Sequence, residues 1–147
     1  DGRFDPVLDD PSADPAAVTR VLLCSGKIGW ELIEGRQNSQ NPDGTAVVRI
    51  EQLYPFPEEH IQQIRSRYEL ADDWVWVQEE PRNAGAWTWM ADMFIQSFDT
   101  HLSVVSRPAN ASPAVGSSRL HREEQEEVIA AALQCNNAEQ NDRRQRT

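Results

Sequence analysis

Residues Trp74–Trp89 have the sequence WVWVQEEPRNAGAWTW, which predicts a strand, a charged tip, a glycine turn and the start of a helix. The run Trp74–Val77 is aromatic and β-branched throughout, as is typical of strands. Pro81 should stop this strand, because proline has no N–H group to donate to a sheet. The helix is expected over Ala86–Phe98. In open α/β sheets, ligands and partner surfaces gather at strand ends of this kind.

The turn after this strand is the first candidate for a functional site. Neighbouring residues of a strand point to opposite faces, so Glu79 and Glu80 cannot serve one reaction centre while the strand continues. We expect one glutamate to accept hydrogen bonds from loop N–H groups or from Arg82, and the other to face a partner. General acid–base chemistry is the alternative. Together with Asn83 and Gly85, the two glutamates form the signature of this turn.

Three more strand–helix pairs flank this segment. Their strands are rich in Val, Ile or Leu, and their helices carry apolar residues three and four positions apart. The strands are expected at Arg20–Ser25, Thr45–Gln52 and Leu102–Ser106, and the helices at Ile28–Gln37, Pro57–Tyr68 and Leu120–Gln134. This alternation predicts an α/β fold, with a mainly parallel sheet covered by helices on both faces.

The two ends of the chain differ in composition from its centre. Asp1–Thr19 contains three prolines and many aspartates, so it is expected to be a linker or arm. Its Phe4, Val7 and Leu8 offer contacts to a neighbouring surface, and a solvated linker is the alternative. Residues 20–134 form the predicted domain, in which the proline-rich loop 107–116 is either functional or a packed crossing. The polar tail 135–147 is expected to be disordered.

Composition excludes several classes of protein. The chain has 147 residues, enough for one domain, and a net charge of −10, which disfavours nucleic acid and anionic membranes as partners. No apolar run approaches the roughly 20 residues of a membrane helix. The two cysteines, Cys24 and Cys135, are expected to stay reduced. The histidines do not have metal-ligand spacing, and no serine has the context of a nucleophile elbow.

Three cations are placed at strand ends or within strands. The turn at Lys27 follows a strand and a glycine and opens a helix, a geometry that offers backbone N–H groups to an anion. An ordinary strand–helix turn is the alternative, since the spacing is not that of a phosphate-binding loop. Arg49 and Arg107 would join Lys27 in a small anion site if the order of the strands brought them together.

The helix Ala86–Phe98 has an unusually wide aromatic face. Trp87, Met90 and Phe94 recur on it, and packing on one side of one sheet does not require so large an apolar surface. A second buried surface, such as a domain or subunit interface, is therefore predicted for these residues. Core filling alone is the alternative.

Four motifs carry a resemblance to a known family. In order, they are LLCSGKIGWEL, VVRIEQLYPFP, WVWVQEEPRNAGAW and SRPANASPAVGSSRLHREEQEE. In order and spacing they resemble the C-terminal domain of the 2-oxoglutarate dehydrogenase E1 component, over about Arg20–Gln134. The resemblance implies a Rossmann-like three-layer sandwich of the transketolase C-terminal type, with a mostly parallel sheet that often carries one antiparallel edge strand. The pair Gly29-Trp30 departs from the more aromatic pair of that family.

The resemblance also implies a function for the longer protein. In that family E1 decarboxylates 2-oxoglutarate on thiamine diphosphate with magnesium, then passes the succinyl group to the lipoyl domain of the E2 succinyltransferase in the citric acid cycle. The GDG…N motif that binds this cofactor is absent from the chain. No catalytic residue is therefore expected here, and the cofactor should bind outside this domain. The expected location is the bacterial cytoplasm, or the mitochondrial matrix in a eukaryote.

The roles left for this domain are assembly and control. Its expected partners are the upstream E1 domains and the other subunit of an E1 homodimer. Some family members are controlled by acyl-CoA or nucleotides at this domain. The residues expected to bind such an effector are Lys27, Arg49, Ser106 and Arg107. A stand-alone acyl-CoA or nucleotide-binding regulatory module and a purely structural interaction domain are the alternatives.

Overall fold

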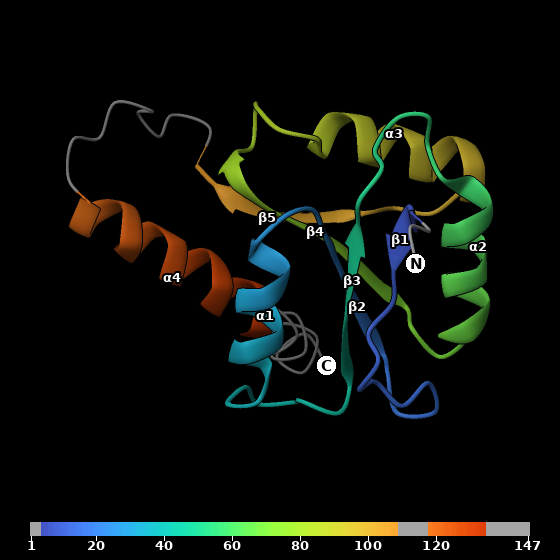
Figure 1. Cartoon of the computed structure of the whole chain (residues 1–147), viewed down its shortest axis with the longest axis horizontal. Helices are drawn as coiled ribbons and strands as arrows, with labels where there is room; N and C mark the ends of the chain where they lie inside the picture. Colours follow the sequence, from blue (N-terminus) through green and yellow to red (C-terminus); the bar gives the residue numbers. More distant parts are fainter. Residues whose placement is uncertain (1–3, 109–117, 135–147) are drawn as a thin grey trace, which may run out of the picture.

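The computed structural model describes residues 4–108 and 118–134, in which strands and helices alternate as predicted (Figure 1). The elements are β1 (Val7–Leu8), β2 (Arg20–Cys24), α1 (Ile28–Arg36), β3 (Thr45–Ile50), α2 (Glu58–Arg67), β4 (Asp73–Pro81), α3 (Trp87–Phe98), β5 (Ser103–Arg107) and α4 (Ser118–Gln134). Pro81 is the last residue of β4, as the sequence predicted. Most of the loop 107–116 and the tail 135–147 lie outside the described residues.

The sheet has five strands in the order β1-β3-β2-β4-β5. β2 runs parallel to both of its neighbours, β3 and β4, and β5 runs parallel to β4. The edge strand β1 pairs antiparallel with β3, with Val7 opposite Ile50. Helices cover both faces of this sheet (Figure 1). The prediction of a Rossmann-like three-layer sandwich with one antiparallel edge strand is confirmed.

Each face of the sheet has its own hydrophobic core. Trp74 and Trp76 of β4 pack with α2 and α3 on one face. Val75 and Val77 of the same strand pack with α1 and α4 on the other. A central strand that is buried on both sides must be apolar at every position, which explains the unbroken run in the sequence.

The predicted interface on α3 is wrong for two of its three residues. Met90 and Phe94 are completely buried in the core beneath α2 and α3, and half-buried Trp87 packs against the same core. The ring centroid of Phe94 lies 6.2 Å from that of Phe56 and 6.4 Å from that of Trp74. Aromatic residues of the domain itself thus cover the wide aromatic face of α3.

The segment before β2 was expected to be a linker or arm, but its described part belongs to the domain. β1 forms the edge of the sheet, and Asp10 is fully buried. The carboxylate of Asp10 is bound by the guanidinium of Arg36, and it accepts hydrogen bonds from the Ser12 hydroxyl at 2.9 Å and the Val47 N–H at 3.0 Å. These contacts join the segment to the last turn of α1 and to β3.

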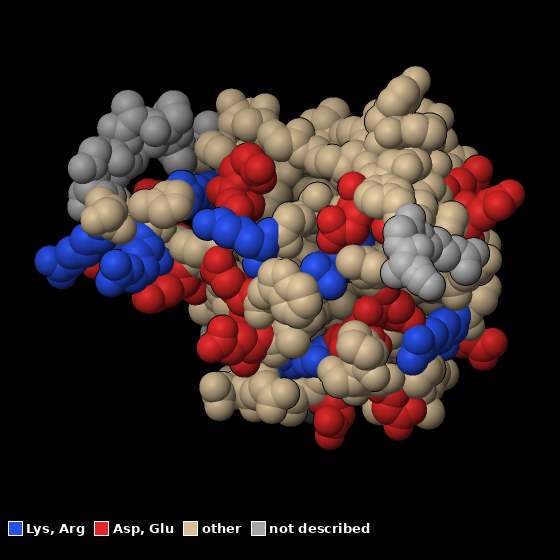
Figure 2. Space-filling view, viewed as in Figure 1, with Lys and Arg blue, Asp and Glu red and all other residues tan. Residues whose placement is uncertain are grey.

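The surface carries charges of both signs. Figure 2 shows acidic and basic side chains interspersed over one face, with basic groups gathered at the outer end of α4. Arg119, near that end, has a side chain that is 88% exposed and pairs with Glu123. Among residues 4–108 and 118–134, no helix is long and apolar enough to cross a membrane.

Candidate functional site

Two hollows lie along the strand ends and helices that the sequence singled out. One runs between α1 and α4 and is called the α1/α4 groove. The other lies where β2 and β4 end and is called the switch-point cavity. From β2 the chain passes to β3 on one side, while β4 lies on the other side of β2. Ligands of open α/β sheets bind at such a change of direction.

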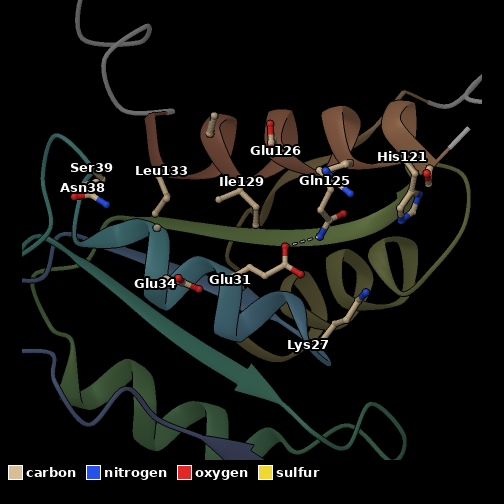
Figure 3. Close-up of a pocket in the computed structure, with 14 residues that line it drawn as sticks. Lys27, Glu31, Glu34, Asn38, Ser39, His121, Gln125, Glu126, Ile129 and Leu133 are labelled. Carbon is tan, nitrogen blue, oxygen red and sulfur yellow. Dashed lines mark hydrogen bonds between the residues drawn. The ribbon is translucent and has the colours of Figure 1, made fainter.

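The α1/α4 groove has a volume of about 820 Å³. Figure 3 shows Lys27 at one end of it, Asn38 and Ser39 at the other, and Ile129 and Leu133 directed inward from α4. The full lining is Lys27, Glu31, Glu34, Gly35, Asn38, Ser39, Ser118, His121, Arg122, Gln125, Glu126, Ile129, Ala130 and Leu133. Apolar groups beside charges of both signs suit a ligand that has an apolar part and a charged part.

The predicted anion site does not assemble. Lys27 lines the groove, but Arg49 does not. The guanidinium of Arg49 lies 4.1 Å from the ring centroid of exposed Trp30, and its nearest carboxylate is that of Glu51 at 3.8 Å. A Cβ atom at Gly29 would lie only 2.6 Å from the Cδ atom of Arg49. At this departure from the family, Gly29 leaves room for the Arg49 side chain, and Trp30 provides the ring on which its guanidinium stacks.

Arg107 and Ser106 of β5 do not line the groove either. Arg107 pairs with Glu124 of α4 at 3.3 Å and contacts His121 Nδ1 at 2.9 Å. The Ser106 hydroxyl donates to the backbone carbonyl of Arg107 at 3.1 Å. Of the four predicted effector residues, only Lys27 faces the groove, because the other three are occupied within the domain.

Gln125 of α4 is a site residue that the sequence did not identify. Its amide NH₂ donates to Glu31 of α1 at 3.1 Å and to Glu79 of β4 at 2.7 Å (Figure 3 draws the bond to Glu31). Three elements are joined by this one side chain. Its position within a run of acidic helix residues, REEQEE, was the only signal in the sequence.

The turn after β4 is organised by a residue that the prediction passed over. Gln78 is buried, and its NH₂ group donates to the carbonyls of Glu80 at 3.3 Å, Pro81 at 2.9 Å and Ala84 at 2.8 Å. Its Oε1 atom accepts from the indole N–H of Trp76 at 2.9 Å and from the backbone N–H of Trp87 at 3.1 Å.

This arrangement corrects the roles expected for the turn signature. Gly85 has φ +69°, and a Cβ atom there would lie 2.9 Å from Gln78 Oε1, so a side chain is excluded. Glu79 contacts α4 instead of the loop N–H groups, and exposed Asn83 is not among the partners of Gln78. Gln78 and Gly85 together shape the turn.

The switch-point cavity has a volume of about 590 Å³. Its lining is Ser25, Gly26, Leu53, Tyr54, Trp76, Val77, Gln78, Glu79, Glu80, Gly85, Ala86 and Trp89. The ring of Trp89 is fixed by its indole N–H, which donates to the carbonyl of Leu53 at 2.8 Å. The ring of Tyr54 lies 5.7 Å from it, centroid to centroid, and Tyr54 is 80% exposed.

Two kinds of side-chain group that could carry chemistry are a thiol and a cluster of metal ligands. Burial raises the pKa of the Cys24 thiol to about 12, so it stays protonated and is a poor nucleophile at neutral pH. In ranges 4–108 and 118–134, no three His, Cys, Asp or Glu residues are grouped so that they could hold a metal ion.

Comparison with known proteins places the chain within much longer relatives. The family model of the 2-oxoglutarate dehydrogenase C-terminal region matches residues 1–133. The 2-oxoadipate dehydrogenase complex component E1 of Xenopus laevis is 44% identical over 131 residues, which cover 88% of this chain and 14% of that protein. The 2-oxoglutarate dehydrogenase E1 components of Geobacillus kaustophilus and Haemophilus influenzae are 42% and 41% identical, and each alignment covers 90% of this chain and 14% of the relative.

Proposed function

Because the chain belongs to the 2-oxoglutarate dehydrogenase C-terminal family, we propose that it is the C-terminal domain of an E1 component of a 2-oxo acid dehydrogenase complex. The match over residues 1–133 is the observation that carries this proposal. The family membership confirms the resemblance of the four motifs. The chain spans about 14% of the length of these relatives, so the activity belongs to a protein of which this domain is one part.

The proposed activity of the whole E1 protein is the oxidative decarboxylation of 2-oxoglutarate, with delivery of the succinyl group to the lipoyl group of an E2 succinyltransferase. We infer that thiamine diphosphate and magnesium bind outside this domain, for two reasons. The GDG…N motif is absent from the sequence, and the described residues lack a cluster that could hold the metal. We therefore place the cofactor in the remainder of the protein.

The substrate is tested by assaying the whole E1 protein, with thiamine diphosphate and magnesium, on 2-oxoglutarate and on 2-oxoadipate. These substrates differ by one methylene, which an enzyme pocket distinguishes by about tenfold or more. A higher kcat/KM for 2-oxoglutarate is expected, because the Geobacillus and Haemophilus relatives are named 2-oxoglutarate dehydrogenase E1 components. A preference for 2-oxoadipate would assign the chain to the function named for the Xenopus relative. Activity on neither would contradict the proposal.

For this domain itself, the proposed role is to support the assembly of the E1 homodimer and to bind an effector. The α1/α4 groove is the effector site that the geometry favours. Apolar Ile129 and Leu133 suit an acyl or pantetheine chain, and Lys27, His121 and Arg122 suit phosphate groups. The same groove supports the alternative of a stand-alone acyl-CoA or nucleotide-binding module.

Replacing Lys27 with alanine is expected to weaken the binding of acetyl-CoA to the whole E1 protein by about tenfold, since it removes one charge-assisted contact to phosphate. Arg67→Ala is the matched control, because Arg67 of α2 is paired with Asp9 and does not line the groove. Isothermal titration calorimetry measures both. Equal loss in the two variants, or loss only with Arg67→Ala, would remove the groove as the site.

Acetyl-CoA binding also helps to distinguish the proposed E1 domain from a stand-alone binding module. A stand-alone module must bind acetyl-CoA as the 147-residue chain and needs no further polypeptide. The proposed E1 domain requires that 2-oxo acid decarboxylation come from the same polypeptide as this chain. Binding by the chain, together with a reading frame that carries no thiamine diphosphate motif, would favour the module.

A further inference from the structure

The switch-point cavity has a lining that the proposed effector site does not explain. The α1/α4 groove and this cavity have no lining residue in common. The cavity's walls are aromatic, with Trp76, Trp89 and Tyr54, and among the described residues Glu79 and Glu80 are the charged ones that line it. A hollow with aromatic faces and a carboxylate has the chemistry that binds a positive charge.

The negative charge of this cavity is not neutralised within the described part of the chain. The ion pairs found there join arginines to Asp9, Asp10, Glu51, Asp73, Glu123 and Glu124. Glu79 accepts a hydrogen bond from neutral Gln125, and the Glu80 residue is exposed. Lys27 follows the lining residue Gly26 in the chain but lines the other hollow.

The cavity is also held in shape before anything binds. Gln78 fixes the backbone from Glu80 to Ala84 through its NH₂ group, and the Leu53 carbonyl holds the Trp89 indole. A preorganised site loses little entropy on binding. Tyr54, by contrast, stands 80% exposed at the rim, an amphipathic ring of the kind enriched at protein interfaces.

We propose that the switch-point cavity receives an arginine or lysine side chain from the part of the E1 protein outside this chain. This inference rests on the proposed function. The relatives contain about seven times the length of the aligned segment, since the alignments cover 14% of them, so a large surface of the same polypeptide is available to cover Tyr54. The cation stacks on the exposed ring of Tyr54, beside Trp89, and pairs with Glu80. Glu79 also lines the cavity, but its carboxylate accepts a hydrogen bond from Gln125 of α4 on the other face of the sheet, so Glu80 is the charged partner of the cation.

The occupant is identified by photocrosslinking in the whole E1 protein. p-Benzoylphenylalanine is placed at Tyr54, the protein is irradiated, and the crosslinked peptides are identified by mass spectrometry. We expect the crosslink to reach a segment outside this chain that carries an arginine or lysine within a few residues. The same probe at Leu70, which is 60% exposed on the loop after α2, is the control for an exposed position away from the cavity.

The charge requirement is tested by Glu80→Lys in the whole E1 protein, with Glu59→Lys on exposed α2 as the matched control. Hydrogen–deuterium exchange of residues 79–86 is expected to accelerate about tenfold in Glu80→Lys and to stay unchanged in Glu59→Lys, because reversing one partner of a close charge pair expels the other. Glu80→Gln should give a smaller acceleration, and this milder variant serves if the lysine variant does not fold.

Two results would overturn the inference. One is a Tyr54 crosslink that reaches only segments of this chain, or only segments without a basic residue. The other is equal exchange in Glu80→Lys, Glu80→Gln and wild type. Either result leaves the proposed function intact if the same preparation decarboxylates a 2-oxo acid. An E1 protein without such activity would instead refute the proposed function, whatever the crosslink shows.

Discussion

Replacing Asp10 with alanine is expected to lower the free energy of unfolding of the chain by about 3–5 kcal/mol, the usual cost of breaking a buried ion pair. Asp10 is fully buried, and its partner Arg36 is 5% exposed. Without the carboxylate, the guanidinium stays buried with an uncompensated charge, and the Val47 N–H loses its acceptor. This loss is a large part of the 5–15 kcal/mol that stabilises a typical domain. Urea unfolding followed by circular dichroism measures it.

Asp14→Ala is the matched control for this experiment. Asp14 is exposed and its carboxylate accepts a hydrogen bond from the Ala16 N–H at 3.0 Å, so loss of this carboxylate should cost about 1 kcal/mol or less. The double variant Asp10→Leu/Arg36→Met should be more stable than Asp10→Ala, because it removes both charges together. Equal stability of Asp10→Ala and Asp14→Ala would contradict the role given to the N-terminal segment.

The same carboxylate makes stability depend on pH. Burial alone would raise the pKa of Asp10, but hydrogen bonds from Arg36, the Val47 N–H and Ser12 outweigh it and hold the pKa below its ordinary value of 3.8. A lowered folded-state pKa adds stability above about pH 3.8 that is lost as the pH falls through the folded value. Below pH 3.8, therefore, wild type should lose more stability than Asp10→Ala does.

Replacing Phe94 with alanine is expected to destabilise the chain by about 3–5 kcal/mol, because it opens a cavity in a fully packed core. Phe94 has no exposed surface, and its ring lies 5.2 Å from that of Phe98 and 6.2 Å from that of Phe56, centroid to centroid. Ile95→Ala, at the 48% exposed neighbouring position, should cost far less. Urea unfolding of the two variants compares these positions directly.

This substitution also separates the two interpretations of the aromatic helix. If Phe94 is a core residue, its replacement must destabilise the chain itself. An interface residue would leave the chain as stable as wild type and abolish only its assembly into a larger protein. Wild-type stability in Phe94→Ala would therefore contradict the core placement and restore the predicted interface on α3.

The strand–helix alternation was predictable because each main strand is a short apolar run with a turn signal after it. The run Trp74–Val77 is the clearest example of such a strand, since it is buried on both faces and has no polar position. The resemblance implied an antiparallel edge strand, but its position in β1 was not predictable from the residues, because Val7 and Leu8 alone do not make a pattern. Its pairing depends on the tertiary contacts of Asp10, which couple residues 26 and 37 positions apart in the chain.

The candidate site was predicted less well, for reasons that lie in side-chain geometry. Sequence places Lys27, Arg49 and Arg107 near strand ends, but it does not show that Trp30 and Glu124 occupy two of them. Gln78 looked like one more polar residue after the strand, although it makes five hydrogen bonds in the turn. The prediction for α3 assumed that its aromatic face packs only on the sheet. A ring from the segment before α2 also packs on this face.

The central claim is that this chain is a working part of an E1 enzyme, and deletion tests it most directly. The whole E1 protein and a version lacking residues 4–134 are assayed for decarboxylation of 2-oxoglutarate with thiamine diphosphate and magnesium, and for dimerisation. We predict activity and a dimer for the whole protein, with both lost on deletion although the cofactor-binding region is retained. Full activity and an intact dimer without residues 4–134, or no 2-oxo acid activity in the whole protein, would contradict the account.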